Sequence, residues 1–114
     1  MSFLSQLFGT KSETLKAIKN LNVAEFKMAI QGKKVQLVDV RTSSEFGAGH
    51  IKNAANIDVF NSAAFEKKFE KYQKESPVYV YCRSGARSMS AAKKLVKMGF
   101  TEVVNLKGGY SAWS

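Results

Sequence analysis

The chain has 114 residues, 45% hydrophobic and 24% charged, so its length and composition fit a single globular domain and exclude a disordered segment. Its 18 Lys and Arg residues against nine Asp and Glu residues give a net charge of +9, which favours anionic partners. Because no helix-turn-helix, zinc-finger or aromatic RNA-binding pattern accompanies this charge, we expect a solvated basic face and no bound nucleic acid.

The start of the chain predicts an N-terminal helical extension over residues 1–20, before a domain that covers residues 21–114. Apolar side chains in this stretch are interrupted by Gly9-Thr10, which favours one or two short helices; a segment that docks on a partner or on a membrane surface is the alternative. No basic start, long apolar run or small-residue cleavage site indicates secretion. No stretch approaches the roughly 18 to 20 apolar residues of a membrane span, so we expect a cytoplasmic protein.

Short apolar runs alternate with helical patterns along the rest of the chain. Apolar, often β-branched runs predict strands at 21–23, 35–40, 54–58, 78–82 and 102–106. Apolar side chains at helical spacing predict helices at 24–31, 63–74 and 88–98, the second with Phe65, Phe69 and Tyr72 on one stripe. This alternation predicts an α/β fold with a mainly parallel sheet and helices on both faces. In such sheets, ligands bind beyond the carboxyl ends of the strands.

The one cysteine, Cys82, stands where the predicted strand 78–82 ends and the next helix begins. It excludes an intramolecular disulfide and a multi-cysteine zinc site, and we expect no metal and no cofactor. The residues after it are small or basic: Arg83, Ser84, Gly85, Ala86, Arg87 and Ser88. Small residues let the backbone curl until successive N–H groups point to one centre, where they, the helix dipole and the arginines favour a thiolate. A small buried core cysteine is the alternative.

The chain resembles the rhodanese homology family, in particular its single-domain members, over about residues 21 to 113. The motifs that carry the likeness are Leu37-Val-Asp-Val-Arg41, Glu45-Phe-Gly-Ala-Gly-His-Ile51, Val78-Tyr-Val-Tyr-Cys-Arg-Ser-Gly-Ala-Arg-Ser88, Met98-Gly-Phe100 and Leu106-Lys-Gly-Gly-Tyr-Ser-Ala-Trp113. The resemblance implies a three-layer fold with a five-stranded, mostly parallel sheet. It also implies that Cys82 is the catalytic cysteine that becomes a persulfide, within a substrate-binding cradle at residues 83–88. Lys52-Asn53 replaces the usual Pro-Gly of the family, and Asp58 stands where a proline is frequent.

Polar residues on neighbouring segments are expected to support the site. Asp39 and Arg41 end a neighbouring predicted strand, where they either face the same crevice or form a buried ion pair. His50 follows Gly49 in a predicted turn, and we expect a structural role for it because a preformed thiolate needs no general base. The departure at Lys52-Asn53 leaves the turn intact, since Asn53 tolerates left-handed backbone angles.

We therefore expect a rhodanese-type thiosulfate sulfurtransferase, which moves a sulfane sulfur from thiosulfate or a persulfide donor through a Cys82 persulfide to a thiol or cyanide acceptor. The expected partners are a small anionic donor and a thiol acceptor, which a protein could supply. One alternative is a sulfur carrier or protein-interaction module without turnover. Another is a Cys-dependent phosphatase or arsenate reductase. Four residues separate Cys82 from Arg87, one fewer than in phosphatases of this fold, which by resemblance favours sulfur transfer.

Overall fold

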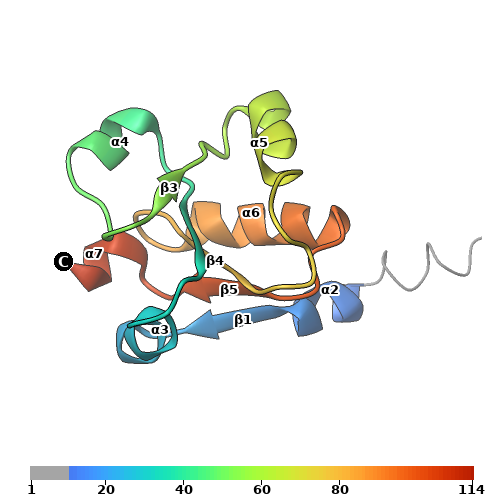
Figure 1. Ribbon diagram of the computed structural model, residues 1–114, viewed down its shortest axis with the longest axis horizontal. Helices are drawn as coiled ribbons and strands as arrows, with labels where there is room; N and C mark the ends of the chain where they lie inside the picture. Colours follow the sequence, from blue (N-terminus) through green and yellow to red (C-terminus); the bar gives the residue numbers. More distant parts are fainter. Residues whose placement is uncertain (1–10) are drawn as a thin grey trace, which may run out of the picture.

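The computed structural model describes residues 11–114, and in this part of the chain five strands form one sheet of order β1-β5-β4-β2-β3 (Figure 1). The strands are β1 (Ile18–Leu21), β2 (Gln36–Asp39), β3 (Ala55–Asn56), β4 (Val78–Tyr81) and β5 (Val103–Leu106). Each neighbouring pair of strands is parallel. The α/β class and the five-stranded sheet that we expected are confirmed.

Helices cover both faces of this sheet. The helices in residues 11–114 are α2 (Lys11–Ala17), α3 (Val23–Ile30), α4 (Ser43–Gly47), α5 (Ser62–Phe69), α6 (Ala86–Lys97) and α7 (Gly109–Trp113). Side chains from α5 and α6 join one buried cluster with Val38 and Val80, and side chains from α3 and α7 pack on the other face. None of these helices has the length and apolar character that a bilayer span requires.

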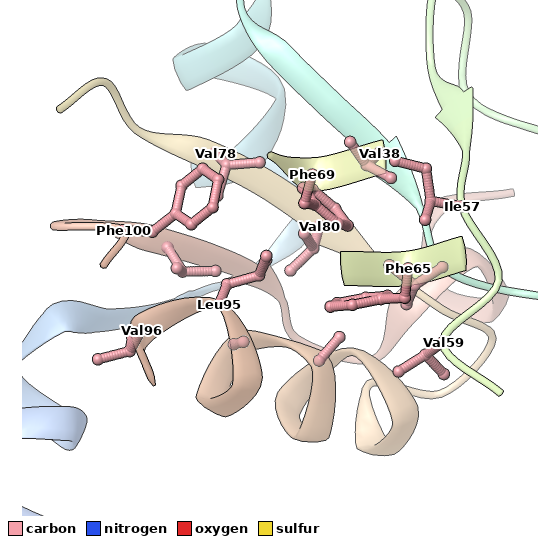
Figure 2. Close-up of a cluster of buried hydrophobic side chains, with 14 of the residues drawn as sticks. Val38, Ile57, Val59, Phe65, Phe69, Val78, Val80, Leu95, Val96 and Phe100 are labelled. Carbon is pink, nitrogen blue, oxygen red and sulfur yellow. The ribbon is translucent and has the colours of Figure 1, made fainter. Parts of the chain in front are cut away.

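The alternation of side chains along β4 decides which way the cysteine points. Val78 and Val80 face the cluster that α5 and α6 cover, and Figure 2 shows them near Phe69 and Leu95. Tyr79 and the buried Tyr81 belong to the cluster on the opposite face. Because side chains alternate between the faces of a strand, the next residue, Cys82, points to the side of α6.

The start of the described chain differs from the prediction. Strand β1 begins at Ile18, inside the stretch expected to be a helical extension, and the strand predicted at 21–23 is wrong beyond Leu21. Asn22 instead caps α3: its side chain accepts from the Glu25 N–H at 2.9 Å, and the Glu25 carboxylate accepts from the Asn22 N–H at 3.0 Å. This reciprocal cap starts the helix at Val23. The apolar residues predicted for helices before residue 11 lie outside the described residues.

One later helix also ends earlier than predicted, and two short helices were not predicted. Helix α5 stops at Phe69 rather than continuing to residue 74. The main chain of Gln73 instead bonds to the side chain of Gln36 on β2, at 2.8 Å and 3.0 Å, which draws this segment toward the sheet. Tyr72 still packs on Phe69, with ring centroids 5.0 Å apart. Helices α4 and α7 were not predicted, because five residues are too few for a clear helical period.

Candidate active site

The loop after β4 folds around the sulfur of Cys82. The main-chain N–H of Gly85 donates to Sγ at 3.0 Å, and the hydroxyl of Ser88 lies 3.4 Å from Sγ. Gly85 has a φ of 104°, a conformation that a residue without Cβ adopts at little cost. Gly85 is also the N-cap of α6, which begins at Ala86 and not at Ser88 as predicted. The first turn of this helix therefore lies against the sulfur.

Opposing effects act on the pKa of the Cys82 thiol. Burial raises it, since Cys82 has no exposed surface. Hydrogen bonds from the Ser88 hydroxyl and from the N–H groups of Ser88, Gly85 and Ser84 lower it, and they hold the pKa below its ordinary value. Ser84 and Ala86 are exposed residues, so their main chain matters more to the loop than their side chains. Cys82 is thus buried, but polar donors surround its sulfur in the manner of an anion site.

Helix α7 holds the loop from its other side. The N–H of Tyr110 donates to the carbonyl of Cys82 at 2.8 Å, and the N–H of Ser111 donates to the carbonyl of Arg83 at 3.0 Å. Gly109 permits this approach, because a Cβ atom there would lie 2.5 Å from main-chain atoms of Cys82 and Arg83. These two bonds fix the main chain of Cys82 and Arg83, just before the Gly85 N–H that donates to the sulfur. This role of α7 was not predicted, although the Gly-Gly pair at its start is a turn signal.

Both arginines of the loop contact one carboxylate, that of Glu45. Arg87 binds it with two parallel hydrogen bonds of 2.8 Å and 2.9 Å, and Arg83 reaches it through Nε at 3.3 Å. The Arg87 hydrogen bonds, against the effect of burial, lower the pKa of Glu45 far below its usual range. No role for Glu45 was predicted from the sequence. The sequence does place Thr42 three positions before Glu45, which is the spacing of a capping box. This cap starts α4 and fixes the Glu45 carboxylate.

Asp39 and Arg41 form a buried ion pair at the end of β2. The Arg41 guanidinium donates to both Asp39 oxygens, at 3.0 Å and 2.7 Å, and to the carbonyl of Gly49 at 2.6 Å. It also lies over the ring of Tyr110, 4.6 Å from the centroid. Of the two readings that the sequence left open, the structure shows the buried pair, although Arg41 also lines the crevice described next. The pair joins the end of β2 to α7.

A hollow of about 240 Å³ opens beside the loop. Its lining comes from four segments and consists of Arg41, Glu45, Ala48, Gly49, Arg83, Tyr110, Ser111 and Ser114. Arg83 is the most exposed of the charged groups at the site, with 62% of its side chain accessible. Cys82, which is buried, does not line this hollow.

The remaining polar residues of the motifs have local structural contacts. The ring of His50 stacks on Phe46 with centroids 3.6 Å apart, and its Nδ1 lies 2.8 Å from the Phe46 carbonyl oxygen. Asn53 has a φ of 73°, so the prediction that it accommodates the left-handed turn is confirmed. Asp58 accepts a hydrogen bond from the N–H of Phe60 at 2.9 Å, which stabilises the turn where the family often has a proline.

The Ser88 hydroxyl is expected to keep the Cys82 thiol acidic. Ser88→Ala removes one donor to Sγ, so the pKa of Cys82 should rise and the pH midpoint of alkylation by iodoacetamide should move upward. In the parent protein that midpoint should lie below the value of about 8.5 for an ordinary thiol. Ser84→Ala is the matched control, because Ser84 acts through its main-chain N–H. Equal midpoints in the parent and Ser88→Ala would contradict this role.

Glu45 is expected to stabilise the fold in a pH-dependent way. Glu45→Gln removes the charge that both arginines contact, and it should lower the unfolding free energy by about 1–3 kcal/mol at pH 7. The folded-state pKa of Glu45 is depressed, so its contribution is complete above the unfolded-state pKa of about 4.3 and is lost as pH falls toward the folded-state value. The difference in unfolding free energy between the parent and Glu45→Gln, measured with urea, should therefore be smaller at about pH 3 than at pH 7. Glu66→Gln, an exposed carboxylate on α5, is the control.

Comparison with known proteins identifies the family. The family model described as rhodanese-like domain matches residues 22–114. Protein YqhL of Bacillus subtilis, named as uncharacterized, is 40% identical over 96 residues, covering 84% of this chain and 72% of that protein. Thiosulfate sulfurtransferase GlpE of Shewanella oneidensis is 35% identical over 99 residues, covering 87% and 95%. A crystal structure of a rhodanese-like domain protein from Staphylococcus aureus matches with a TM-score of 0.74 and 32% identity, covering 84% and 91%. The chain belongs to the rhodanese-like domain family.

Proposed function

We propose that this protein is a thiosulfate sulfurtransferase that carries the transferred sulfur as a persulfide on Cys82. The observation that carries the proposal is the position of the Cys82 sulfur, with the Gly85 N–H at 3.0 Å and the Ser88 hydroxyl at 3.4 Å. These donors favour a thiolate, the form of cysteine that acts as a nucleophile. In a persulfide the charge moves to the outer sulfur, one S–S bond beyond Sγ, where the main-chain N–H groups of the same loop would stabilise it.

The reaction proceeds in two displacements. The Cys82 thiolate attacks the outer sulfur of thiosulfate, a new S–S bond forms, and the bond to the inner sulfur breaks with its electron pair leaving on sulfite. The acceptor, cyanide or a thiolate, then attacks the outer sulfur of the persulfide. The S–S bond between Cys82 and the outer sulfur breaks, thiocyanate or a new persulfide leaves, and the Cys82 thiolate is restored. Charge and sulfur balance in both steps, and no oxidant or reductant is required.

Arg83 is the side chain best placed to meet the anionic donor. Arg87 has both terminal nitrogens bonded to Glu45, so its charge is largely neutralised where it lies. Arg83 shares the same carboxylate at 3.3 Å, is mostly exposed and lines the hollow beside the loop. Two guanidinium groups against one carboxylate leave one positive charge beside the loop, which balances the Cys82 thiolate. This charge reduces the repulsion between the thiolate and the anionic thiosulfate.

The same contacts argue against a phosphatase. A phosphate ester bound at the loop would need the guanidinium of Arg87, and this group is engaged in a two-point contact with Glu45. The sulfur carrier remains an outcome of the test, because a carrier and an enzyme share the first displacement and differ in how fast small acceptors complete the second. The geometry of the loop supports the first displacement directly.

Steady-state release of thiocyanate tests the proposal. With thiosulfate and excess cyanide, the protein should form many equivalents of thiocyanate per Cys82, at a rate that saturates with thiosulfate. Arg83→Ala should raise the KM for thiosulfate with little change in kcat, because the side chain attracts the donor without reacting. Release of one equivalent of sulfite with little or no thiocyanate would identify a carrier. Release of neither sulfite nor thiocyanate would remove the sulfurtransferase proposal.

A further inference from the structure

A groove lined by lysine side chains lies on the face of the sheet that α3 and α7 cover. Two hollows of about 300 Å³ and 470 Å³ share Ile30, Lys52 and Asn53 and are therefore adjacent; together they are here called the lysine groove. Its walls are the end of α3, the turn that follows α3, the turn at residues 50–53 and the end of α7. The groove contains no part of the Cys82 loop.

The charges of the lysine groove have one sign. Lys27, Lys33, Lys34 and Lys52 line it, all four are exposed, and no Asp or Glu residue does. Among the residues that the structure describes, none of the four has an ion-pair partner within 4.0 Å. Lys52 contributes to both hollows. The groove is therefore complementary to an anion.

Apolar side chains line the lysine groove together with the lysines. They are Ile30, Leu37, Ile51 and Trp113, of which Leu37 and Ile51 are buried. A lining that combines lysines with apolar side chains suits a peptide that presents both carboxylates and an apolar side chain. A single small anion would leave most of the two hollows, of about 300 Å³ and 470 Å³, empty.

We propose that the lysine groove binds an acidic, extended segment of a partner protein. Nucleic acid fits the groove less well, because Lys27 Nζ lies over the Trp113 ring, 4.9 Å from its centroid, and so competes with a base for stacking there.

The groove lies next to the proposed active site through two shared elements. Gly49 lines the hollow beside Arg83, and the next residue, His50, lines the lysine groove. In α7, Tyr110 lines the hollow beside Arg83 and Trp113 lines the lysine groove. A protein held by its acidic segment would therefore stand beside the mouth of the Cys82 loop. The binding itself does not depend on the proposed sulfur transfer.

Peptide binding to the Cys82→Ser variant tests the lysine groove apart from sulfur chemistry. The probe is a short, capped, fluorescein-labelled peptide rich in Glu and Asp with one Leu. It should bind saturably by anisotropy, less tightly as salt is added, while the same peptide with Gln and Asn should not bind. An unlabelled copy should change the emission of Trp113, which is the one tryptophan of the chain and lies in the groove.

Two variants of equal net charge locate the binding. Lys33→Glu combined with Lys52→Glu reverses two groove charges and should weaken the acidic peptide by about tenfold. Lys67→Glu combined with Lys68→Glu reverses two exposed charges on α5, on the opposite face of the sheet, and should change affinity by less than about twofold. Equal losses in the two variants, no binding, or tighter binding of an oligothymidine that the groove variant alone weakens would each overturn the proposal.

Discussion

Cys82→Ser is expected to lower thiocyanate formation from thiosulfate and cyanide by at least about a thousandfold. The hydroxyl of serine is neutral at every pH of interest, so the donors from Gly85 and Ser88 would face a group that cannot attack a sulfur atom as a thiolate does. The chain has one cysteine, and no second thiol can replace it. The rate is measured with protein concentration raised until the residual activity is defined.

The fold of the Cys82→Ser variant must be intact for this loss to be informative. Serine is close in size to cysteine, and its hydroxyl can accept from the same donors, so the urea midpoint should move little despite the burial of the position. The Ser88→Ala variant adds an internal comparison, since it keeps the nucleophile and should retain measurable turnover. Activity in Cys82→Ser within tenfold of the parent would contradict the role of this sulfur.

Gly109→Ala is expected to cost about 3 kcal/mol or more of unfolding free energy and to impair sulfur transfer along with it. The added Cβ would lie 2.5 Å from the carbonyl oxygens of both Cys82 and Arg83, so either α7 or the loop must move. Movement would also stretch the bond from the Tyr110 N–H to the Cys82 carbonyl. Urea unfolding measures the first effect, and thiocyanate release measures the second.

Gly32→Ala is the matched control for backbone strain. Gly32 has a φ of 67°, close to the 62° of Gly109, but a Cβ atom there would meet nothing within 4 Å. Gly32→Ala should therefore lower the unfolding free energy by about 1 kcal/mol, because only the left-handed conformation opposes the added Cβ, and should leave sulfur transfer unchanged. Similar losses of stability in the two variants would mean that α7 does not hold the loop by close approach.

Local pattern was sufficient to predict the centre of the fold. Successive side chains of the run Val78–Tyr81 belong in turn to the two buried clusters, and Ala91 and Leu95 lie at helical spacing on α6. The strand and the helix on either side of Cys82 could therefore be predicted from the sequence. The start of β1 at Ile18 could not be read, because this edge strand buries neither of its two central residues.

The contacts that complete the site come from distant parts of the chain, and local pattern carries no information about them. Glu45 is 38 positions before Arg83 and meets it only because β2 and β4 are neighbours in the sheet. The five residues of α7 are too short to show a period, yet they bond to the carbonyls of Cys82 and Arg83. The loop sequence predicted the donors to the sulfur, whereas the groups that fix the loop required the three-dimensional fold.

Intact mass after incubation with thiosulfate tests most directly whether the loop holds a transferred sulfur. The parent protein, freed of small molecules and kept without reductant, should gain the mass of one sulfur atom, and a thiol such as dithiothreitol should remove it. The Cys82→Ser variant should gain nothing. An unchanged mass in the parent, or an equal gain in the variant, would contradict persulfide formation at Cys82.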